Sequence, residues 1–264
     1  MKNTPPSVAA MPVIVAGTGN LAHHLPGMLQ LAGHKPTYWM GRDKNALAAL
    51  AEKWGAEVLD DVHPSDLTMP HLLFLAVSDT AIPVLAAPWV AAGHVVVHCS
   101  GSVASESVGD AGGVFYPMQT FSGSSSPDLS KIPFFVTTKN DALRSFLVET
   151  AQKISGKVTV IDDEQRRLLH LSAVLVNNFT NHLVLLAEQL LQVNGLDYRS
   201  LLPLMQETVA KLERMSPEQA QTGPAQRADH GVIAAHLQLL ENYPEVRDVY
   251  TLLTNSILRK ESEP

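Results

Sequence analysis

The chain has 264 residues, of which 45% are hydrophobic and 17% are charged, so it is long enough and apolar enough for two packed domains of ordinary size. Its formal net charge is −7 and it has no dense run of lysine and arginine, which argues against a nucleic-acid partner. The single cysteine excludes an internal disulfide framework and a cysteine-rich zinc site. The first residues are a poor secretory signal, and the apolar segments are interrupted well short of a membrane span. We therefore expect a cytoplasmic protein with no membrane partner.

The first half of the chain alternates short apolar runs with helical or loop stretches. Residues 20–32 and 43–54 are examples of the helical stretches. This alternation predicts an α/β domain over residues 1–161, with a doubly wound, mainly parallel sheet covered by helices on both faces. The apolar runs expected to form its strands are 13–16, 36–40, 72–77, 94–98, 114–116, 133–137 and 157–161.

After Asp162 the apolar residues recur at helical spacing instead. Residues 163–194 read as one long helix, and 198–214, 224–242 and 245–259 read as further helices. The sequence therefore predicts an all-helical second domain over residues 162–264.

The first strand runs into a turn of the form G-x-G-x-x-A, which is the dinucleotide-binding fingerprint. Gly17 permits the tight turn, Gly19 lets the backbone approach a pyrophosphate, and Ala22 is small enough for the helix to pack on the strand. The start of that helix offers free N–H groups to phosphates. A plain glycine turn is the alternative, but the place of the motif at the head of a strand–helix array favours a cofactor site. Its candidate contacts are Gly17, Thr18, Gly19, Asn20, Leu21 and Ala22.

The second strand ends without the acidic residue that an NAD-specific site places there. Met40 and Gly41 fill those positions, and Arg42 follows them. We expect Gly41 and Arg42 to contact the cofactor, with the guanidinium pairing with the 2′-phosphate of NADP(H). The alternative is that Arg42 is a solvated residue and that Asp43 only caps the next helix.

Two later strands end in polar residues, at the edge where doubly wound sheets bind their ligands. Val77 and Ser78 are expected to line the nicotinamide side of a cofactor site. Asp79 is interpreted as the N-cap of the following helix in preference to a chemical role. Ser100 is a candidate cofactor contact, and Ser102 is a candidate substrate contact.

The segments GTGNLA, AVSD, HCSGS, YPMQTFS, HLSAVLVNNFTNHL and TGPAQRAD occur in this order. With them the chain resembles bacterial NADP oxidoreductases that join a Rossmann domain to a helical domain of unknown function. Its first half is similar to that of the pyrroline-5-carboxylate reductases and the deazaflavin-dependent NADP oxidoreductases. Its second half is similar to the helical domain of the 6-phosphogluconate dehydrogenase group. The resemblance implies NADP as cofactor in the glycine turn, an active cleft between the domains, and a homodimer formed through the helical half.

The long helix departs from the hydroxyacid dehydrogenases of that wider group, which place a lysine and, four residues later, an asparagine at the substrate. No lysine lies in the middle of this helix, which carries His170, Asn177, Asn178, Asn181 and His182 instead. We interpret His170 as a candidate proton donor, and Asn177, Asn178 and Asn181 as groups that orient a polar substrate. The asparagines would alternatively satisfy buried backbone at a helix crossing or a dimer seam. His182 is interpreted as structural.

The segment TGPAQRADHG, residues 222–231, reads as the start of another helix, with Pro224 in its first turn. Arg227 and Asp229 are candidate substrate contacts, because an arginine at a helix start can hold a carboxylate or a phosphate. A capped helix with a surface Arg–Asp pair is an equally open interpretation. No histidine spacing matches a metal site, so no metal is expected.

The main hypothesis is therefore an NADP(H)-dependent oxidoreductase that moves a hydride between nicotinamide and a small-molecule carbonyl, imine or hydroxy compound. The alternative is a non-catalytic NADP(H)-binding redox sensor or scaffold, in which the helical face serves dimerisation only. Turnover of NADPH separates the two.

Overall fold

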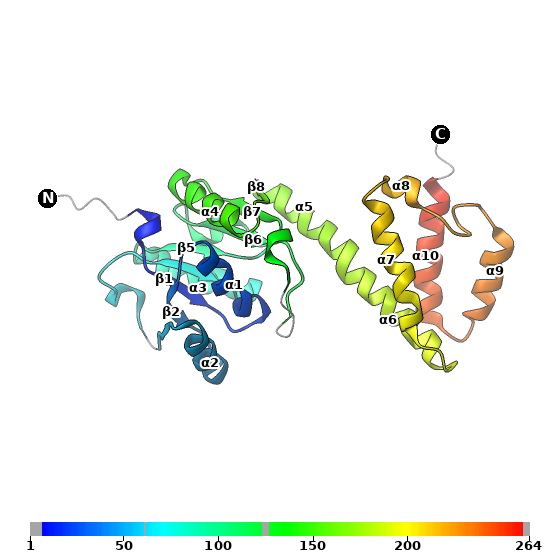
Figure 1. The fold of residues 1–264 in the computed structure, drawn as a ribbon, viewed down its shortest axis with the longest axis horizontal. Coiled ribbons are helices and arrows are strands. Elements are labelled where there is room, and N and C mark those ends of the chain that lie inside the picture. The colour runs from blue at the N-terminus through cyan, green and yellow to red at the C-terminus, as the bar shows by residue number, and fades with distance from the viewer. Residues whose placement is uncertain (1–6, 61, 123–126, 261–264) are drawn as a thin grey trace. The chain divides into compact units, whose positions relative to one another are not determined.

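The structure is a computed structural model that describes residues 7–60, 62–122 and 127–260, and it divides into two compact units (Figure 1). The first unit comprises Met1–Asn177 and holds the sheet, and the second comprises Asn178–Pro264. The division falls inside the long helix, which begins at Asp163, one residue after the start of the predicted second domain.

The sheet of the first unit has eight strands in the order β3-β2-β1-β4-β5-β6-β7-β8. Neighbouring strands are parallel except for β6 and β7, which are antiparallel. The predicted Rossmann-type, doubly wound and mainly parallel sheet is thereby confirmed. Its strands are β1 (Val13–Ala16), β2 (Pro36–Met40), β3 (Glu57–Val58), β4 (Leu72–Leu75), β5 (Val95–His98), β6 (Gly113–Pro117), β7 (Phe134–Thr137) and β8 (Val158–Val160).

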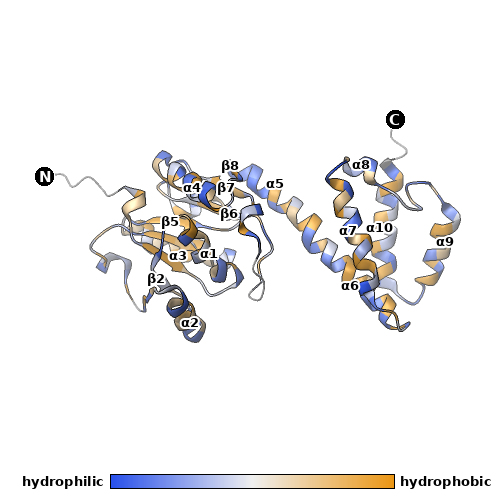
Figure 2. Cartoon of the chain, in the orientation of Figure 1, coloured by the Kyte–Doolittle hydropathy of each residue, from blue (hydrophilic) through white to orange (hydrophobic). Residues whose placement is uncertain are grey.

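The two faces of the sheet carry separate cores, because successive side chains of a strand point to opposite sides. In β1, Val13 and Val15 enter one core while Ile14 and Ala16 enter the other. Three helices cover the first face and one covers the second, so that the central strands are apolar on both sides. In Figure 2 orange, the colour of hydrophobic residues, is frequent in the sheet. The first face is covered by α1 (Asn20–Leu31), α2 (Lys44–Trp54) and α4 (Asp141–Ile154), and the second by α3 (Ile82–Ala91).

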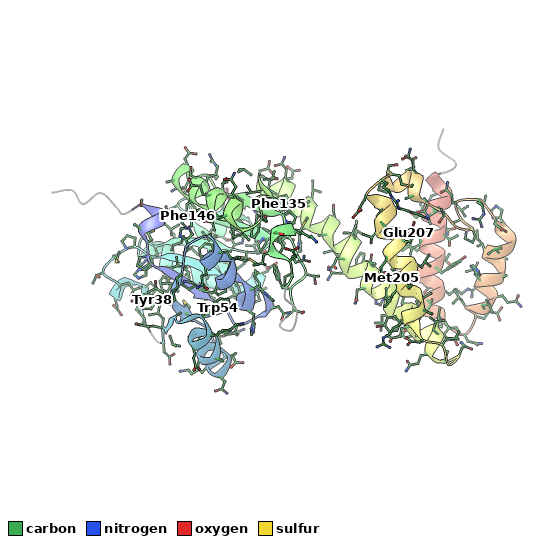
Figure 3. The ribbon with its side chains drawn as sticks, in the orientation of Figure 1. Tyr38, Trp54, Phe135, Phe146, Met205 and Glu207 are labelled. Carbon is green, nitrogen blue, oxygen red and sulfur yellow. The ribbon has the colours of Figure 1, made fainter. Side chains whose placement is uncertain are left out.

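Helices α1 and α2 pack closely through one glycine and one aromatic ring. A Cβ at Gly27 of α1 would lie 3.0 Å from the ring of Trp54, the last residue of α2, which is labelled in Figure 3. Asp43 caps α2, because its carboxylate accepts hydrogen bonds from the N–H groups of Asn45 and Ala46. The predicted capping role of Asp43 is confirmed, and α2 is held in place beside the end of β2.

The described part of the second unit contains helices and turns without strands, which confirms the predicted all-helical half. Figure 3 labels Met205 and Glu207 on one of its helices. The small helix of residues 217–220 was not predicted. The helices are α6 (Phe179–Gln192), α7 (Leu202–Leu212), α8 (Pro217–Ala220), α9 (His230–Leu239) and α10 (Pro244–Lys260).

The long helix is continuous from Asp163 to Gln192 but is not uniform. Helix α5 (Asp163–Ala173) passes through a π-helical turn, Val174–Asn178, into α6. The prediction of one long helix is confirmed, but the π turn was missed. A π turn inserts an additional residue, so it shifts the helical phase of Asn177 relative to His170.

The same helix is long and apolar enough to cross a membrane by the measures of length and composition alone. Its most apolar window has a mean hydropathy of 1.2. The sequence pattern led us to expect no such segment. Asp163 and Arg166 lie near its start and Asn177, Asn178 and His182 lie in its middle, and such groups are costly in a bilayer. Its length is therefore weak evidence for a membrane span.

The helix expected at 224–242 begins only at His230, so the prediction was wrong at its start. Ala228 has a φ of 50°, outside the right-handed helical region, and therefore interrupts any helix that Pro224 would begin. Asp229 is the N-cap, because its side chain accepts a hydrogen bond from the N–H of Val232. Arg227 consequently lies in the turn before the helix and not in its first turn.

Candidate functional site

A cleft of about 940 Å³ opens in the first unit at the carboxyl ends of β1, β2, β4 and β5. The chain order reverses between β1 and β4, which is where doubly wound sheets bind ligands. Ala22 does not line the cleft and is fully buried in the core, as expected for the small residue of the motif. The other predicted cofactor contacts all line it: Gly17, Thr18, Gly19, Asn20, Leu21, Gly41, Arg42, Val77, Ser78 and Ser100.

Gly17 is required by the fold itself. It has a φ of 128°, and a Cβ there would lie 2.1 Å from the carbonyl oxygen of Ala76 at the end of β4. Its own N–H donates to the carbonyl of Met40 over 2.9 Å, and its carbonyl accepts from Nε1 of the buried Trp39 over 2.8 Å. The turn is therefore fixed against both neighbouring strands.

Gly19 is not required by the packing of the chain. Its φ is −81°, which any residue can adopt, and a Cβ there would meet no atom within 4 Å. It is the N-cap of α1, and no side chain caps that helix or places a negative charge in its first turn. The helix start therefore keeps unpaired N–H groups beside open space, and this arrangement fits the pyrophosphate of a dinucleotide.

Arg42 lies at the end of the cleft formed by β2. Its side chain is exposed and lines the cleft, and a Cβ at the neighbouring Gly41 would make a tight contact, 3.0 Å from Cγ2 of Thr18. Of the carboxylates that the structure describes near Arg42, Asp43 caps α2 and Asp60 lies 2.8 Å from Nζ of Lys44. The guanidinium of Arg42 is therefore a group that can bind a phosphate in the part of the cleft next to β2.

A chain of polar side chains joins the ends of β4 and β5. Ser102 Oγ donates a short hydrogen bond to Oδ2 of Asp79, and it lies 3.3 Å from Oγ of Ser100. Asp79 and Ser100 both line the cleft. The expected role of Asp79 as an N-cap is wrong: Ser78 occupies the cap position, without a side-chain cap bond, and Asp79 turns to Ser102 instead.

Cys99 lines the cleft but is no candidate nucleophile. Only 7% of the residue is exposed, and burial raises the pKa of its thiol to about 12. Its neighbour His98 is fully buried, and burial, with Arg166 as a second cause, lowers its pKa to about 4. Both groups are therefore neutral at physiological pH and serve as core.

His170 belongs to the first unit and lies close to these polar residues. Its Nδ1 lies 3.1 Å from Oη of Tyr116 in β6, and the two rings meet edge to face with centroids 5.9 Å apart. The imidazole also covers Gly101, where a Cβ would lie 2.5 Å from Nδ1. Gly101 stands between Ser100 and Ser102, so His170 neighbours the polar chain at the cleft.

The first turn of α5 is bound to the loop that follows Ser102. The carboxylate of Asp163 accepts hydrogen bonds from both the N–H and the hydroxyl of Ser105. It also forms an ion pair of 2.6 Å with Arg166, whose side chain is fully buried and donates a short hydrogen bond to the carbonyl of Val103. These bonds fix the helix that carries His170.

Sequence reasoning missed Tyr116, Asp163 and Arg166. The tyrosine lies in a quoted segment, YPMQTFS, but nothing in the sequence pairs it with a histidine 54 positions later. The DEQRR start of α5 carries a signal, because Asp163 and Arg166 are three residues apart and can pair on one helix face. That signal does not show that the pair is buried.

The remaining predicted site residues are exposed or lie in the second unit. Asn177 closes the first unit and is exposed, as are Asn178 and Asn181 in the second. Arg227 is exposed in the turn before α9, and Asp229 is used as its N-cap. Their proposed roles at the substrate stay predictions.

Residues 132–257 match the model of a family described as a domain of unknown function, DUF2520. No curated protein matches the chain.

Solved structures extend the likeness to almost the whole chain. A Bacteroides fragilis protein described as a "putative NADP oxidoreductase" is 35% identical, with a TM-score of 0.85 over 96% of this chain and 100% of that one. An imine reductase from Streptomyces aurantiacus is 16% identical, with a TM-score of 0.67 over 94% of each chain. A pyrroline-5-carboxylate reductase from Coxiella burnetii is 18% identical, with a TM-score of 0.52 over 95% of this chain and 97% of that one. The last two likenesses establish the fold alone.

Proposed function

Because the chain belongs to the same family as the Bacteroides fragilis protein described above, we propose that it is a cytoplasmic enzyme that binds NADP(H). It reduces a small carbonyl or imine compound, or oxidises the corresponding alcohol or amine. Because two proteins of the same fold are described as an imine reductase and a pyrroline-5-carboxylate reductase, C=N compounds are the substrates that we would test first.

The observation that carries this proposal is the contrast between the two glycines of the turn. Gly17 is explained by the packing of the chain, but Gly19 is not, since a side chain there would meet open space. A ligand that approaches the backbone closely explains it. The main-chain N–H groups at the start of α1 then bind the pyrophosphate, and Arg42 binds the 2′-phosphate.

The substrate end of the site is formed by the polar residues beyond β4 and β5. When bound, NADPH supplies the hydride for the reacting carbon. Ser100 and Ser102, with the carboxylate of Asp79, orient a polar group of the substrate. His170 in its imidazolium form gives the proton from Nε2 to the carbonyl oxygen or imine nitrogen and is left as neutral imidazole, which regains a proton from solvent.

We also propose that the enzyme is a homodimer formed through its helical half. Many large apolar side chains of the second unit are exposed, and Figure 2 shows orange segments along its helices. A second copy of the chain would remove this surface from water. A protein interface also accommodates the polar groups of the long helix at a lower cost than a bilayer does. Examples are Phe179 (53% exposed), Leu204 (66%), Val209 (64%) and Leu252 (65%).

Gly19→Ala tests the cofactor site directly. The added methyl group meets no protein atom, so the free energy of unfolding stays within about 0.5 kcal/mol of the wild type. NADPH binding, followed by the fluorescence of the reduced nicotinamide, weakens by about tenfold, which corresponds to about 1.4 kcal/mol. Gly231→Ala is the matched control, because its Cβ would make only an ordinary contact, 3.6 Å from Asp229. Equal NADPH affinity in both variants contradicts the assigned role of Gly19.

His170→Gln tests the catalytic assignment. The amide keeps a polar group at this position but cannot supply a proton as imidazolium does. We expect unchanged NADPH affinity and a loss of about 10²-fold or more in kcat on a panel of cyclic imines and small aldehydes. A wild-type protein that binds NADPH but oxidises none of it on this panel would favour the non-catalytic alternative.

A further inference from the structure

The hydrogen-bond partner of His170 is the phenol hydroxyl of Tyr116, which can act both as a donor and as an acceptor. A phenol oxygen can accept a hydrogen bond from Nδ1–H and can also donate one to a bare Nδ1. A carboxylate or a backbone carbonyl only accepts, so it would hold Nδ1 in the protonated state alone. The bond between Tyr116 and His170 can therefore persist whether the ring is imidazolium or neutral.

The phenol is kept in the form that allows both kinds of bond. Tyr116 is half-buried in β6, with its ring beside that of Phe135 in β7, which Figure 3 labels. Burial raises the pKa of Tyr116, and the guanidinium of Arg166 opposes this shift in part. The hydroxyl therefore keeps its proton at physiological pH, while Asp163 balances the charge of Arg166.

The position of the imidazole is fixed from a second side as well. His170 covers Gly101, where no side chain would fit, and its helix is bound to the neighbouring loop through Asp163 and Arg166. With Nδ1 held by Tyr116, no side-chain bond to the remaining ring nitrogen, Nε2, is formed by the residues that the structure describes, so Nε2 is available to a substrate.

We propose that Tyr116 is a positioning residue for His170. Its hydroxyl holds Nδ1 through both protonation states, so that Nε2 is always the nitrogen that exchanges a proton with the substrate. When the imidazolium gives its Nε2 proton to the substrate, Nδ1 keeps its own proton and donates it to the oxygen of Tyr116, so the neutral ring is left with a bare Nε2. This inference rests on the proposed function, in which His170 supplies the proton.

The tautomer of His170 tests the inference without any substrate. In ¹⁵N- and ¹³C-labelled protein, at a pH at which the ring is neutral, we expect the wild type to show the Nδ1–H tautomer alone, with Nε2 bare. Tyr116→Phe keeps the ring packing but removes the hydroxyl, so a mixture of tautomers is expected. His170→Gln identifies the signal. An Nε2–H tautomer in the wild type, or an unchanged tautomer in Tyr116→Phe, overturns the inference.

Tyr250→Phe provides the matched control, because it removes a similar bond in the helical unit. There the Tyr250 hydroxyl lies 2.9 Å from Nδ1 of His236, again with edge-to-face rings. This variant is expected to leave the signals of His170 unchanged. If it alters them as much as Tyr116→Phe does, the effect is not specific to the Tyr116 bond and the inference fails.

Turnover gives the second readout and separates this inference from the proposed function. On an imine that the wild type reduces, Tyr116→Phe lowers kcat by about 10- to 100-fold and leaves the KM for NADPH unchanged. Combined with His170→Gln it causes little further loss, because both changes act on one group. Full activity in Tyr116→Phe contradicts the inference and leaves the proposed function standing. Failure of the wild type to bind NADPH contradicts the proposed function, whereas the tautomer result still decides the role of Tyr116.

Discussion

At the scale of single residues, two glycines separated by one position are present for different reasons. Gly17 is required by the nearby carbonyl of Ala76 and by its own positive φ, whereas no described residue would lie within 4 Å of a Cβ at Gly19. The motif alone does not separate these roles, because it prescribes glycine at both positions. We therefore expect a substitution of Gly17 to lower the free energy of unfolding, and a substitution of Gly19 to weaken cofactor binding instead.

Gly17→Ala is expected to destabilise the protein. The methyl group would overlap a backbone oxygen and the residue would keep an unfavourable φ, so the free energy of unfolding falls by about 2 kcal/mol or more. Urea denaturation followed by circular dichroism measures this. A change below about 0.5 kcal/mol would show that the turn can relax and that the packing explanation is wrong.

His98 gives the stability of the protein a pH dependence. Its pKa falls to about 4 in the folded state, against about 6.5 in an unfolded chain. Between these values only the unfolded chain takes up the proton, so the free energy of unfolding decreases as pH falls from 7 to 4. The contribution of His98 is about 3 kcal/mol, and the lowered pKa of His71 acts in the same direction.

The variant His98→Asn isolates this contribution. An asparagine oxygen can accept the hydrogen bond that the N–H of Ser100 makes to Nδ1, over 3.1 Å. Urea midpoints measured at several pH values should depend less on pH in this variant than in the wild type. The exposed His182→Asn should keep the wild-type slope. Parallel slopes in all three proteins would exclude His98 as the source.

At the scale of elements, the start of α5 contributes to stability through a buried ion pair and not only through the helix propensity of its residues. Asp163 and Arg166 form an i,i+3 ion pair, and Asp141 and Arg144 form a second one at the start of α4, each with a distance of 2.6 Å. The two pairs differ in burial, because Arg166 is fully buried whereas Asp141 is 88% exposed at its side chain. They therefore serve as a matched comparison.

Asp163→Asn is expected to lower the free energy of unfolding by about 3 kcal/mol, because it leaves a buried guanidinium without its counter-charge. Asp141→Asn should cost less than about 0.5 kcal/mol, since exposed pairs contribute little. Urea denaturation of both variants checks the difference. Similar losses in both would mean that the Asp163–Arg166 pair does not anchor α5.

The sequence predicted elements well where they are long or strongly apolar. The runs that became β1, β4 and β5 were recognisable because central parallel strands are apolar on both faces. Strand β3 has two residues, Glu57 and Val58, which are too few to form a pattern. The π turn was missed because its residues, VLVNN, include no glycine or proline that would mark an interruption of the helix. The start of α9 was misplaced because nothing in the sequence indicates the positive φ of Ala228.

The candidate site likewise contains residues that the sequence predicts and residues that it does not predict. The residues of the glycine turn are contiguous in sequence, so their grouping at the cleft was predictable. Tyr116 and His170 are 54 positions apart, and Arg166 meets Val103 across 63 positions. Such contacts depend on how a helix packs against the sheet, and local patterns contain no information about that packing.

At the scale of the whole molecule, the exposed apolar side chains predict self-association. Light scattering coupled to size-exclusion chromatography should give twice the chain mass of 28.6 kDa. Replacing one of the exposed residues with a charge, as in Val209→Glu, should shift the protein toward the monomer if the residue lies in the interface. A monomeric wild type at micromolar concentration would contradict the proposed homodimer.

The proposed function depends on the binding of NADPH in the first unit by the glycine turn and Arg42. The most direct measurement is a fluorescence titration of the wild type and Arg42→Ala with NADPH and with NADH. We expect saturable binding of NADPH that is tighter than that of NADH, and a loss of about 10- to 100-fold in NADPH affinity in the variant with little change for NADH. No saturable binding, or a preference of the wild type for NADH, would contradict it.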